Sequence, residues 1–440
     1  MPPPTADLCV LADSAVLPEG PGARTTLSPG PVAVYISQGV IVALECVASL
    51  DGFAPTCPTM RTPLLLPGCV DLHTHGVGGA DDLADFWLNP EYTASRVPAL
   101  GTTSFLASVV FGTDAEEGTR RVVAAISALA GATGHGAVCE GIHAEGPVVA
   151  DFGGLPQTEL PSMPLSRFDA LVDSMLPHLK VMTISPSLDS AEGYPRLSKL
   201  LAVGVLPALG HDRGCTEADI LGALRVAAVA GVRCHVTHLF NVSSFHHRSP
   251  SLSNFGLVRT MPSLPAYSGL LPPTVEVIAD CAHVHPLALQ LLFESRAAAG
   301  DVACVTDSVM EPVPGAECCY NDRRIKVSAD GRAVLLKGTD TLAGSCCGLL
   351  DAFRTVVNVL GRGVAEASDA VAASPAAIAG LGHVGLIAVG RRADLLLVGP
   401  GPEFALSATL VAGKVVFGAP VAEGGGESML RCEPCADPIT

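Results

Sequence analysis

The middle of the chain alternates short apolar runs with longer amphipathic stretches, and this alternation constrains the fold most. The amphipathic stretches include DAEEGTRRVVAAISALAG and TEADILGALRVAAVAG. Eight apolar runs over about 250 to 300 residues are typical of a (β/α)8 TIM-type barrel, in which each parallel strand is followed by a helix. A doubly wound open sheet competes, but it predicts a Gly-rich phosphate loop after the first strand, and the sequence has none there. The runs are LLLPGCVDLHTH, TSFLASVV, AVCEGIHAEGP, VMTISPS, VLPALGH, CHVTHLF, VEVIADCAH and VACVTDSV.

Strand-like segments at the two ends of the chain predict a second, smaller domain. VAVYISQGVIVALECV near the start, and GLIAVGRRADLLLVGP and ATLVAGKVVFG near the end, are short apolar runs joined by turn residues. We predict that residues 1–62 and 383–425 pair into one small β-sandwich domain, with the catalytic barrel inserted between them over residues 63–382. Residues 426–440 would form a tail, in which the C-x-x-C of Cys432 and Cys435 alone indicates little.

The composition predicts a well-packed acidic protein. Of 440 residues, 49% are apolar and 16% are charged, which favours a large core over disorder. A formal charge of −17 argues against general binding to nucleic acid or to an anionic membrane surface. No apolar run is long enough to span a bilayer, and MPPPTADLCV lacks the features of a signal peptide. We therefore expect a cytoplasmic protein whose 15 cysteines are reduced.

Ionisable side chains fall where the predicted strands end. In a parallel barrel the C-terminal ends of all strands meet on one face, which is where active sites form. A single His at a strand end is usually structural, but His, Glu or Asp at equivalent places on several strands indicates a metal site. These residues are Asp71, His73 and His75 on the first run, His143 and Glu145 on the third, His211 on the fifth, His238 on the sixth, Asp280 and His283 on the seventh, and Asp307 on the eighth.

The spacing of these residues predicts which side chains face the mouth of the barrel. His73 and His75 are two residues apart, so both imidazoles point to the same side of a strand, and His143 and Glu145 repeat that spacing. Imidazole and carboxylate ligands suit Zn²⁺, Fe²⁺, Mn²⁺ or Co²⁺, and we expect Zn or Fe. Glu145 can bridge two ions, which leaves one or two ions per subunit open. The two ligand sets would be His73, His75, Glu145 and Asp307, and Glu145, His211 and His238.

Motifs in a fixed order give the chain a family resemblance. PGCVDLHTHG resembles the opening motif of the amidohydrolase superfamily, and GIHAEGP, LGHD, VTHLFN, FHHR, IADCAHVHP, VTDSV and TLAGS follow it. Together with SPAAIAGL and GLIAVGRRADLLLV, they resemble the N-acetylglucosamine-6-phosphate deacetylase family over nearly the whole chain. The resemblance implies a metal-dependent amide hydrolase of amino-sugar catabolism, which converts N-acetyl-D-glucosamine 6-phosphate to glucosamine 6-phosphate and acetate.

The resemblance also implies a role for each site residue. Glu145, His211 and His238 would be the core metal ligands, and His73 and His75 would serve a second ion. The catalytic acid and base would be Asp307, because a carboxylate beside the reacting water can take its proton and pass it to the leaving amine. The substrate would be held by Asn241, Val242, Arg248, His283 and the backbone of Leu342, Ala343 and Gly344.

One segment departs from the family pattern. After HAEGP the family usually has a Lys-Gly-x-His stretch whose His helps to polarise the substrate carbonyl, but this chain reads HAEGPVVADFGGLPQ. Gln157 could donate a hydrogen bond in place of that His. The alternatives are that the metal polarises the carbonyl alone or that the substrate differs.

A phosphorylated amino sugar needs a cation in an otherwise acidic protein. Arg248, preceded by His246 and His247, offers a local basic cluster. In the family this Arg can reach across a dimer interface, so the resemblance implies a homodimer.

Two rival functions stay open. A cyclic-amide hydrolase of the same superfamily, similar to dihydroorotase or dihydropyrimidinase, usually bridges its metals with a carboxylated Lys on the fourth strand. Here Lys180 comes just before the fourth run, and Glu145 takes the bridging place. A non-catalytic barrel relative would typically lose metal ligands, which this chain keeps.

Overall fold

The structure, a computed structural model, describes residues 6–20, 24–77, 89–112, 115–296, 300–320 and 323–419. The predicted tail with Cys432 and Cys435 lies outside the described residues. Among the helices that are described, none is long and apolar enough to cross a membrane.

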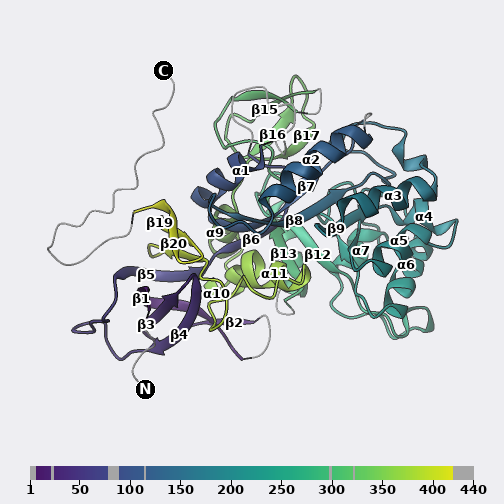
Figure 1. Ribbon diagram of the computed structural model, residues 1–440. Helices are drawn as coiled ribbons and strands as arrows, with labels where there is room; N and C mark the ends of the chain where they lie inside the picture. The colour runs from purple at the N-terminus through teal and green to yellow at the C-terminus, as the bar shows by residue number, and fades with distance from the viewer. Residues whose placement is uncertain are drawn as a thin grey trace.

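Parallel strands form the barrel that the apolar runs predict (Figure 1). The strands are β6 (Cys69–Thr74), β7 (Thr102–Val109), β8 (Val138–Glu145), β9 (Leu179–Ile184), β10 (Leu206–Leu209), β11 (His235–Val236), β12 (Thr274–Ile278) and β13 (Val302–Val305). Strands that follow one another in the chain also pair in the sheet, from β6 at one edge to β13 at the other. They are buried along nearly their whole length, as expected when both faces of a parallel sheet are covered.

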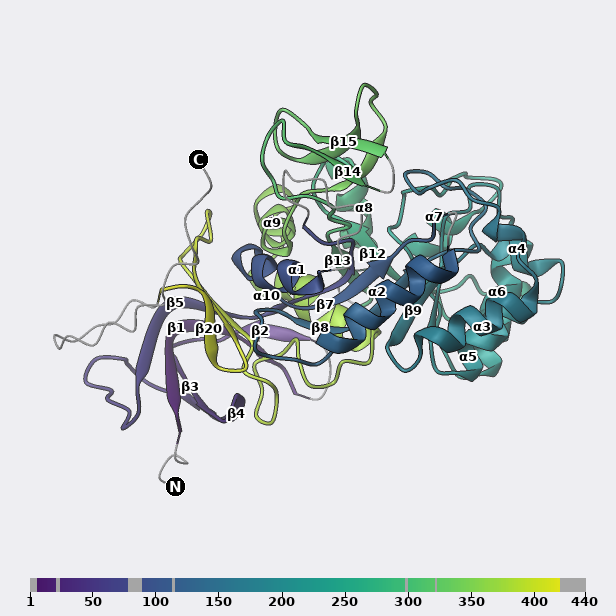
Figure 2. The same cartoon turned by 45° about the horizontal axis from the view of Figure 1, so that its top comes forward.

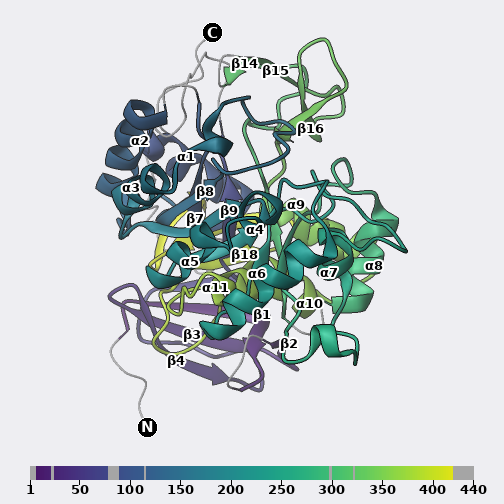
Figure 3. The same ribbon diagram turned by 90° about the vertical axis from the view of Figure 1, so that its right-hand side faces the viewer.

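Helices connect these strands, and Figure 3 shows α5, α6 and α7 in front of them. The helices are α1 (Pro90–Arg96), α2 (Ala115–Leu129), α3 (Leu165–Met175), α4 (Pro186–Ser190), α5 (Pro195–Ala202), α6 (Glu217–Val229), α7 (Leu252–Leu257), α8 (Pro286–Arg296), α9 (Leu349–Arg354), α10 (Val364–Ser368) and α11 (Ser374–Ile378). Local sequence explains the start of α6, where Thr216 and Asp219 form a capping box. Thr216 Oγ1 accepts from the Asp219 N–H at 3.3 Å, and Asp219 Oδ2 accepts from the Thr216 N–H at 2.8 Å.

Three apolar layers hold the barrel together. Phe105 and Phe168 belong to the layer between β7–β10 and the helices from α2 to α6. Phe293 and Phe353 belong to a second layer, which packs α8 and α9 against β11–β13. Leu72 belongs to the third, which fills the inside of the barrel. Each fully buried side chain of this size contributes about 1.5 to 3 kcal/mol, so these layers fix the strands that carry the site.

The barrel closes between its first and last strands through one buried carboxylate. Asp71 Oδ2 accepts a hydrogen bond from Thr306 Oγ1 at 2.6 Å, and Asp71 Oδ1 accepts one from the Thr306 N–H at 3.2 Å. The Asp307 N–H continues this seam by donating to the carbonyl of His73 at 2.8 Å. Burial raises the pKa of Asp71 to about 7, although the bonds from Thr306 oppose the shift. The seam therefore brings the ends of β6 and β13 together.

Strands from both ends of the chain form one mixed sheet, as the sequence predicts. The strands are β1 (Leu8–Pro18), β2 (Thr25–Leu27), β3 (Val32–Ser37), β4 (Val40–Cys46), β5 (Thr59–Pro67), β18 (Leu395–Val398), β19 (Leu406–Val411) and β20 (Lys414–Gly418). Their order is β20-β19-β18-β5-β1-β3-β4, with β2 beside β1, so β5 and β18 join the two chain ends. In Figure 1 these are the purple and yellow strands. The predicted division at residue 62 falls inside β5, and the domain boundaries stay a prediction.

At the connection from β5 to β6, a single residue, Gly68, links this mixed sheet to the barrel. It lies between the end of β5 and the start of β6. A Cβ atom at this position would overlap the side chain of Thr103 on β7, so the close approach requires glycine.

A separate four-stranded antiparallel sheet, which the sequence did not predict, lies between β13 and α9. Its strands are β14 (Glu317–Tyr320), β15 (Arg323–Val327), β16 (Ala333–Leu336) and β17 (Leu342–Ser345), in that order. Figures 1 and 2 show it on the opposite side of the barrel from β3 and β4. The Ser345 N–H donates to the carbonyl of Asp307 at 2.8 Å, so β17 is held at the C-terminal end of the barrel.

The seam between β6 and β13 can be tested by replacing Thr306 with Val, which keeps the shape of the side chain but removes its hydroxyl. We expect Thr306→Val to lower the free energy of unfolding by about 1 to 3 kcal/mol, because the buried Asp71 carboxylate loses a donor. Urea denaturation followed by circular dichroism measures this change. The exposed Thr26→Val is the matched control and should stay within about 0.5 kcal/mol of the parent. Equal midpoints for the two variants would contradict this role of the seam.

Candidate metal centre

Ionisable side chains meet at the C-terminal mouth of the barrel, where their places in the sequence predict them. Each lies at or shortly after the end of a barrel strand, and nearly all are fully buried. The most open is Asp307, whose side chain is 15% exposed. The group consists of His73 and His75 at the end of β6, Glu145 at the end of β8, His211 after β10, His238 after β11 and Asp307 after β13.

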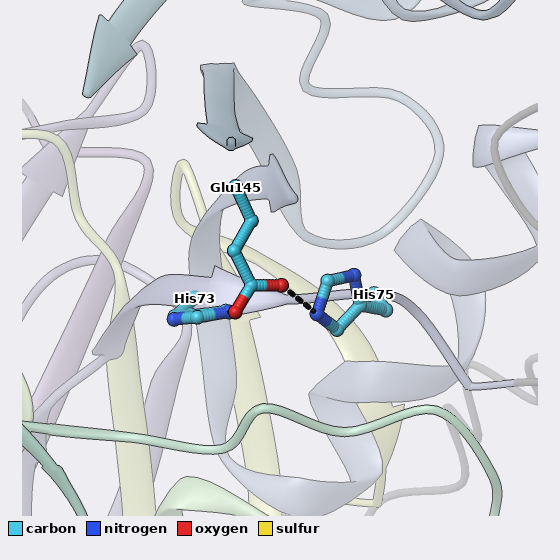
Figure 4. A group of neighbouring side chains, drawn as sticks. All are labelled: His73, His75 and Glu145. Carbon is cyan, nitrogen blue, oxygen red and sulfur yellow. Dashed lines mark ion pairs between the residues drawn. The ribbon is translucent and has the colours of Figure 1, made fainter. Parts of the chain in front are cut away.

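Glu145 lies at the centre of this group. Its Oε1 is 2.8 Å from Nε2 of His211 and 3.1 Å from Nε2 of His238. Its Oε2 is 3.1 Å from Nε2 of His75, the ion pair that Figure 4 shows. Glu145 therefore belongs to two triads of possible ligand atoms, each within 4.8 Å, one with His73 and His75 and the other with His211 and His238.

The imidazole of His73 carries an unsatisfied ligand atom. Its Nε2 is buried and makes no hydrogen bond, although Asp307 Oδ1 and Glu145 Oε1 lie 3.5 and 3.6 Å away. Buried polar atoms are nearly always paired, so an orphaned nitrogen facing two carboxylates requires an explanation. A divalent cation bound between these groups would provide it, because imidazole nitrogen and carboxylate oxygen are ordinary zinc and iron ligands.

The carboxylates make this buried group attractive to positive charge. Burial opposes protonation of the His75 ring, but hydrogen bonds to Asp307 and Glu145 raise its pKa to about 9. Burial also disfavours the ionised form of Glu145, yet the neighbouring imidazole of His73 holds the pKa of that carboxyl well below its usual range. A metal ion can replace protons at such a site, because the ligands bind it in their deprotonated forms.

Oxygen atoms outside the group fix the orientation of the rings. For His73, His75 and His211 an oxygen holds Nδ1 and leaves Nε2 directed at the carboxylates, whereas the buried Nδ1 of His238 has no hydrogen-bond partner among the described residues. Where that oxygen is a carbonyl, it can only accept, so Nδ1 carries the proton and Nε2 keeps a lone pair for a metal. The contacts are His73 with Glu276 Oε1 at 2.6 Å, His75 with the Ser108 carbonyl at 3.1 Å, and His211 with the Asp151 carbonyl at 2.7 Å.

His143, also at the end of β8, lies beside the ligand group rather than within it. Its Nδ1 is 3.1 Å from Ser108 Oγ and its Nε2 is 2.9 Å from Thr183 Oγ1, so hydroxyl groups occupy both nitrogens. Burial lowers its pKa to about 3, and the charge of nearby His73 adds to the shift. His143 is therefore a neutral ring packed against His73, with ring centroids 4.4 Å apart.

The backbone is strained where these strands end. The angle φ is 52° at His211, 25° at His238 and 47° at Asp307. Left-handed angles of this kind cost about 1 to 3 kcal/mol in non-glycine residues and persist where surrounding contacts enforce them. Each residue lies two positions past the end of its strand, so the strained turn orients the functional side chain.

A cavity of about 440 Å³ opens over the group, a size that suits a small ligand. Nδ2 of Asn241 is buried there without a hydrogen-bond partner, so it has donors available to a ligand. Most of the residues that the family resemblance assigns to the substrate line this cavity, namely Asn241, Val242, His283, Leu342, Ala343 and Gly344.

Two residues of the predicted substrate-binding set do not line this cavity. Arg248 is exposed on the segment after β11. Gln157 is also exposed and lines a separate hollow with Thr158 and Glu159. The structure of one chain therefore does not bring either side chain to the metal ligands, and their roles stay predictions.

The cavity also contains residues that sequence reasoning missed. Arg213 lines it and directly follows the LGHD motif, so its place in the sequence was a usable signal. Tyr320 lines it as well, with its ring centroid 6.0 Å from that of His75, but it comes from the unpredicted sheet. Gly153 lets the segment after Glu145 pack close to Val242, because a Cβ atom at Gly153 would lie 2.6 Å from Cγ2 of Val242.

Known proteins resemble this chain over most of its length. The sequence profile of the Amidohydrolase family matches residues 64–416. The N-acetylglucosamine-6-phosphate deacetylase of Bacillus subtilis (strain 168) is 29% identical over 394 residues, which cover 87% of this chain and 92% of that protein. The protein of the same name from Bos taurus is 30% identical over 367 residues, which cover 80% and 83% of the two chains.

A solved structure shares the fold. It is a mutant N-acetyl-D-glucosamine-6-phosphate deacetylase from Mycobacterium smegmatis in complex with N-acetyl-D-glucosamine-6-phosphate. It matches with a TM-score of 0.76 and 24% identity, over 94% of this chain and 100% of that one. The likeness extends over both the barrel and the mixed sheet of the chain ends.

Replacing His211 tests whether the triads hold a metal. We expect His211→Asn to lower the metal affinity of the purified protein by at least about 10-fold, because one triad loses a ligand nitrogen. Elemental analysis after dialysis against graded chelator concentrations measures this loss. The exposed His135→Asn is the matched control and should keep the parental metal content. A His211→Asn protein that keeps as much metal as the control would show that the ion binds elsewhere.

Proposed function

The chain belongs to the amidohydrolase family, and on that basis we propose that it is a metal-dependent deacetylase of N-acetyl-D-glucosamine 6-phosphate. Hydrolysis of this substrate gives glucosamine 6-phosphate and acetate. The observation that carries the proposal is the pair of buried triads that share Glu145 beneath a ligand-sized cavity. The curated relatives with this activity in their names match most of the chain, which supports the choice of substrate.

The ligand group fits one or two divalent transition-metal ions. Glu145, His211 and His238 would hold one ion, and His73 and His75 would hold a second with Glu145 shared. Zinc or iron suits these donors, and no cysteine is found among the described residues that line the cavity. Bound there, such an ion supplies Lewis acidity, which makes water more acidic and an amide carbonyl more electrophilic.

Asp307 is placed to move the proton. Its carboxylate lines the cavity, with Oδ1 3.1 Å from Nε2 of His75. Burial alone would raise the pKa of Asp307, but the charge of His73 and the hydrogen bond from His75 hold it below its ordinary value. Asp307 is therefore ionised at neutral pH and can accept a proton from the attacking water. The protonated carboxyl can then donate to the amine, which leaves only when protonated.

Other residues in the cavity can hold the sugar. The unpartnered Nδ2 of Asn241 can donate to a hydroxyl or phosphate oxygen. His283 is fixed by its Nδ1, 2.6 Å from Asp280 Oδ2, so its Nε2 remains for the substrate. We propose that Asn241, Val242 and His283 contact the sugar, and that the backbone of 342–344 closes over the acetamido group.

Neither Arg248 nor Gln157 lines the cavity above the ligand group of its own chain. We propose that Arg248 serves the site of a second copy in a homodimer, as the resemblance implies. Gln157 directly follows Pro156, which does line the cavity, so Gln157 lies near the rim. Polarisation of the carbonyl by Gln157 and a cytoplasmic location stay predictions.

A cyclic-amide hydrolase of the same family is the second candidate, and the structure disfavours it. Lys180 is the second residue of β9, at the opposite end of that strand from the ligand group. A carboxylated Lys180 therefore could not bridge the ions. A non-catalytic relative is also disfavoured, because Glu145 and all four predicted histidine ligands lie within the two triads.

Acetate release tests the proposed function. We expect the purified protein to release acetate from N-acetylglucosamine 6-phosphate, to lose this activity when its metal is stripped, and to regain it with Zn²⁺ or Fe²⁺. Each acetate released should be matched by one newly formed free amine. No acetate from this sugar or from unphosphorylated N-acetylglucosamine, despite bound metal, would exclude the deacetylase. Hydrolysis of a dihydropyrimidine by the same preparation would then indicate the cyclic-amide reaction.

Asp307→Asn tests the proton transfer. The variant keeps the size of the side chain but removes the base, so we expect kcat to fall by about 10²- to 10⁴-fold. Steady-state kinetics on N-acetylglucosamine 6-phosphate at saturating metal measure the change. The same chemical change at the exposed Asp51, Asp51→Asn, is the control and should leave kcat unaltered. A kcat equal to that of the control would remove Asp307 from the reaction.

A further inference from the structure

We infer that Arg213 binds the phosphate of the substrate within its own subunit and sets the preference for phosphorylated sugars. The inference rests on the proposed deacetylase function and deepens it. Arg213 follows the metal ligand His211 by two residues and lines the cavity. Among the described residues that line this cavity, it is the single Arg or Lys.

The rest of the cavity lining has the wrong charge for a phosphate. Glu145 and Asp307 contribute carboxyl groups to the lining, and the chain as a whole carries a formal charge of −17. The ring of His283 is already paired with Asp280, 2.6 Å away. A dianionic phosphate therefore needs a cation that faces it directly, and the planar guanidinium of Arg matches two phosphate oxygens at once.

The local structure holds Arg213 at the cavity while leaving its guanidinium available. The Arg213 N–H donates to Asp151 Oδ2 at 2.6 Å, and the Arg213 carbonyl accepts from Ser244 Oγ at 3.2 Å. The guanidinium itself has one polar partner among the described residues, Asp151 Oδ1, at 3.8 Å. That ion pair is long and the Arg213 side chain is 54% exposed, so the pair is weak and most of the donors are left for a ligand.

Arg213 and Arg248 would reach the phosphate from different chains. Arg248 is exposed and does not line the cavity of its own chain, so it can contribute only across a subunit interface. Arg213 lines the cavity of every subunit. Arg213 can therefore contact the phosphate within its own chain, in addition to any contact from Arg248 of a second copy.

Kinetics with two sugars test this inference. We expect Arg213→Ala to raise KM for N-acetylglucosamine 6-phosphate by about 10- to 100-fold, the loss typical of a charge-assisted hydrogen bond, with kcat changed less than about threefold. The kcat/KM for unphosphorylated N-acetylglucosamine should stay at the parental value, and inorganic phosphate should inhibit the variant more weakly. Arg213→Lys keeps the charge and should recover part of the affinity. Arg225→Ala, at an exposed Arg on α6, is the matched control.

The outcomes separate this inference from the proposed function. An unchanged KM in Arg213→Ala, an equal loss on both sugars, or a KM effect in Arg248→Ala alone would overturn the role of Arg213. If the parent hydrolyses neither sugar, the proposed function fails. Calorimetry with N-acetylglucosamine 6-phosphate and metal-loaded protein then decides the inference, since weaker binding by Arg213→Ala supports it and equal affinity overturns it.

Discussion

The carboxylate of Glu145 is the group on which the rest of the site depends. A lone carboxylate buried in a barrel would be too poorly solvated to stay ionised, and its pKa would rise. Here imidazoles surround it, and its pKa falls instead. Those imidazoles come from the ends of three other strands, β6, β10 and β11, so no local segment can compensate this charge alone. The barrel must close before Glu145 is satisfied, and closing the barrel is also what assembles the metal ligands.

Closure of the barrel depends on a buried carboxyl group of its own, that of Asp71, which links the stability of the barrel to the proposed catalytic residue. Asp71 joins the first and last strands through Thr306, and the next residue along the chain is Asp307. The backbone of Asp307 is tied to β6 and to β17, since it donates to the carbonyl of His73 and accepts from the N–H of Ser345. These bonds hold Asp307 at a φ of 47°, which an isolated turn would seldom adopt. The strained residue is therefore the one proposed to move the proton, and the seam provides the contacts that keep it strained.

The sequence predicts most of the ligand group, because the positions of the strand ends can be recognised from local sequence patterns. Alternating apolar runs define the strands, and a parallel barrel brings all strand ends to one face, so His73, Glu145 and His238 can be placed together without knowing a contact. Other features depend on contacts between distant segments. The strands of the sheet that carries Tyr320 are short and half exposed, so their pattern did not distinguish them from loop. Whether Gln157 faces the cavity depends on the path of its loop, which the sequence does not encode in a periodic pattern.

The segment after Glu145 departs from the family pattern and still packs closely against the rest of the cavity. It lacks the usual Lys and His, but its two glycines let the chain pack closely, with Gly154 against the backbone of Leu342 and Ala343. Arg323 on β15 donates a hydrogen bond to the carbonyl of Gly154 and so ties this segment to the four-stranded sheet.

Within the same segment, Asp151 accepts hydrogen bonds from two functional residues. Its carbonyl accepts from Nδ1 of the metal ligand His211, while its carboxylate accepts from the backbone of Arg213. One residue therefore orients both a proposed metal ligand and the proposed phosphate-binding residue, so a single short turn positions the two sites relative to each other.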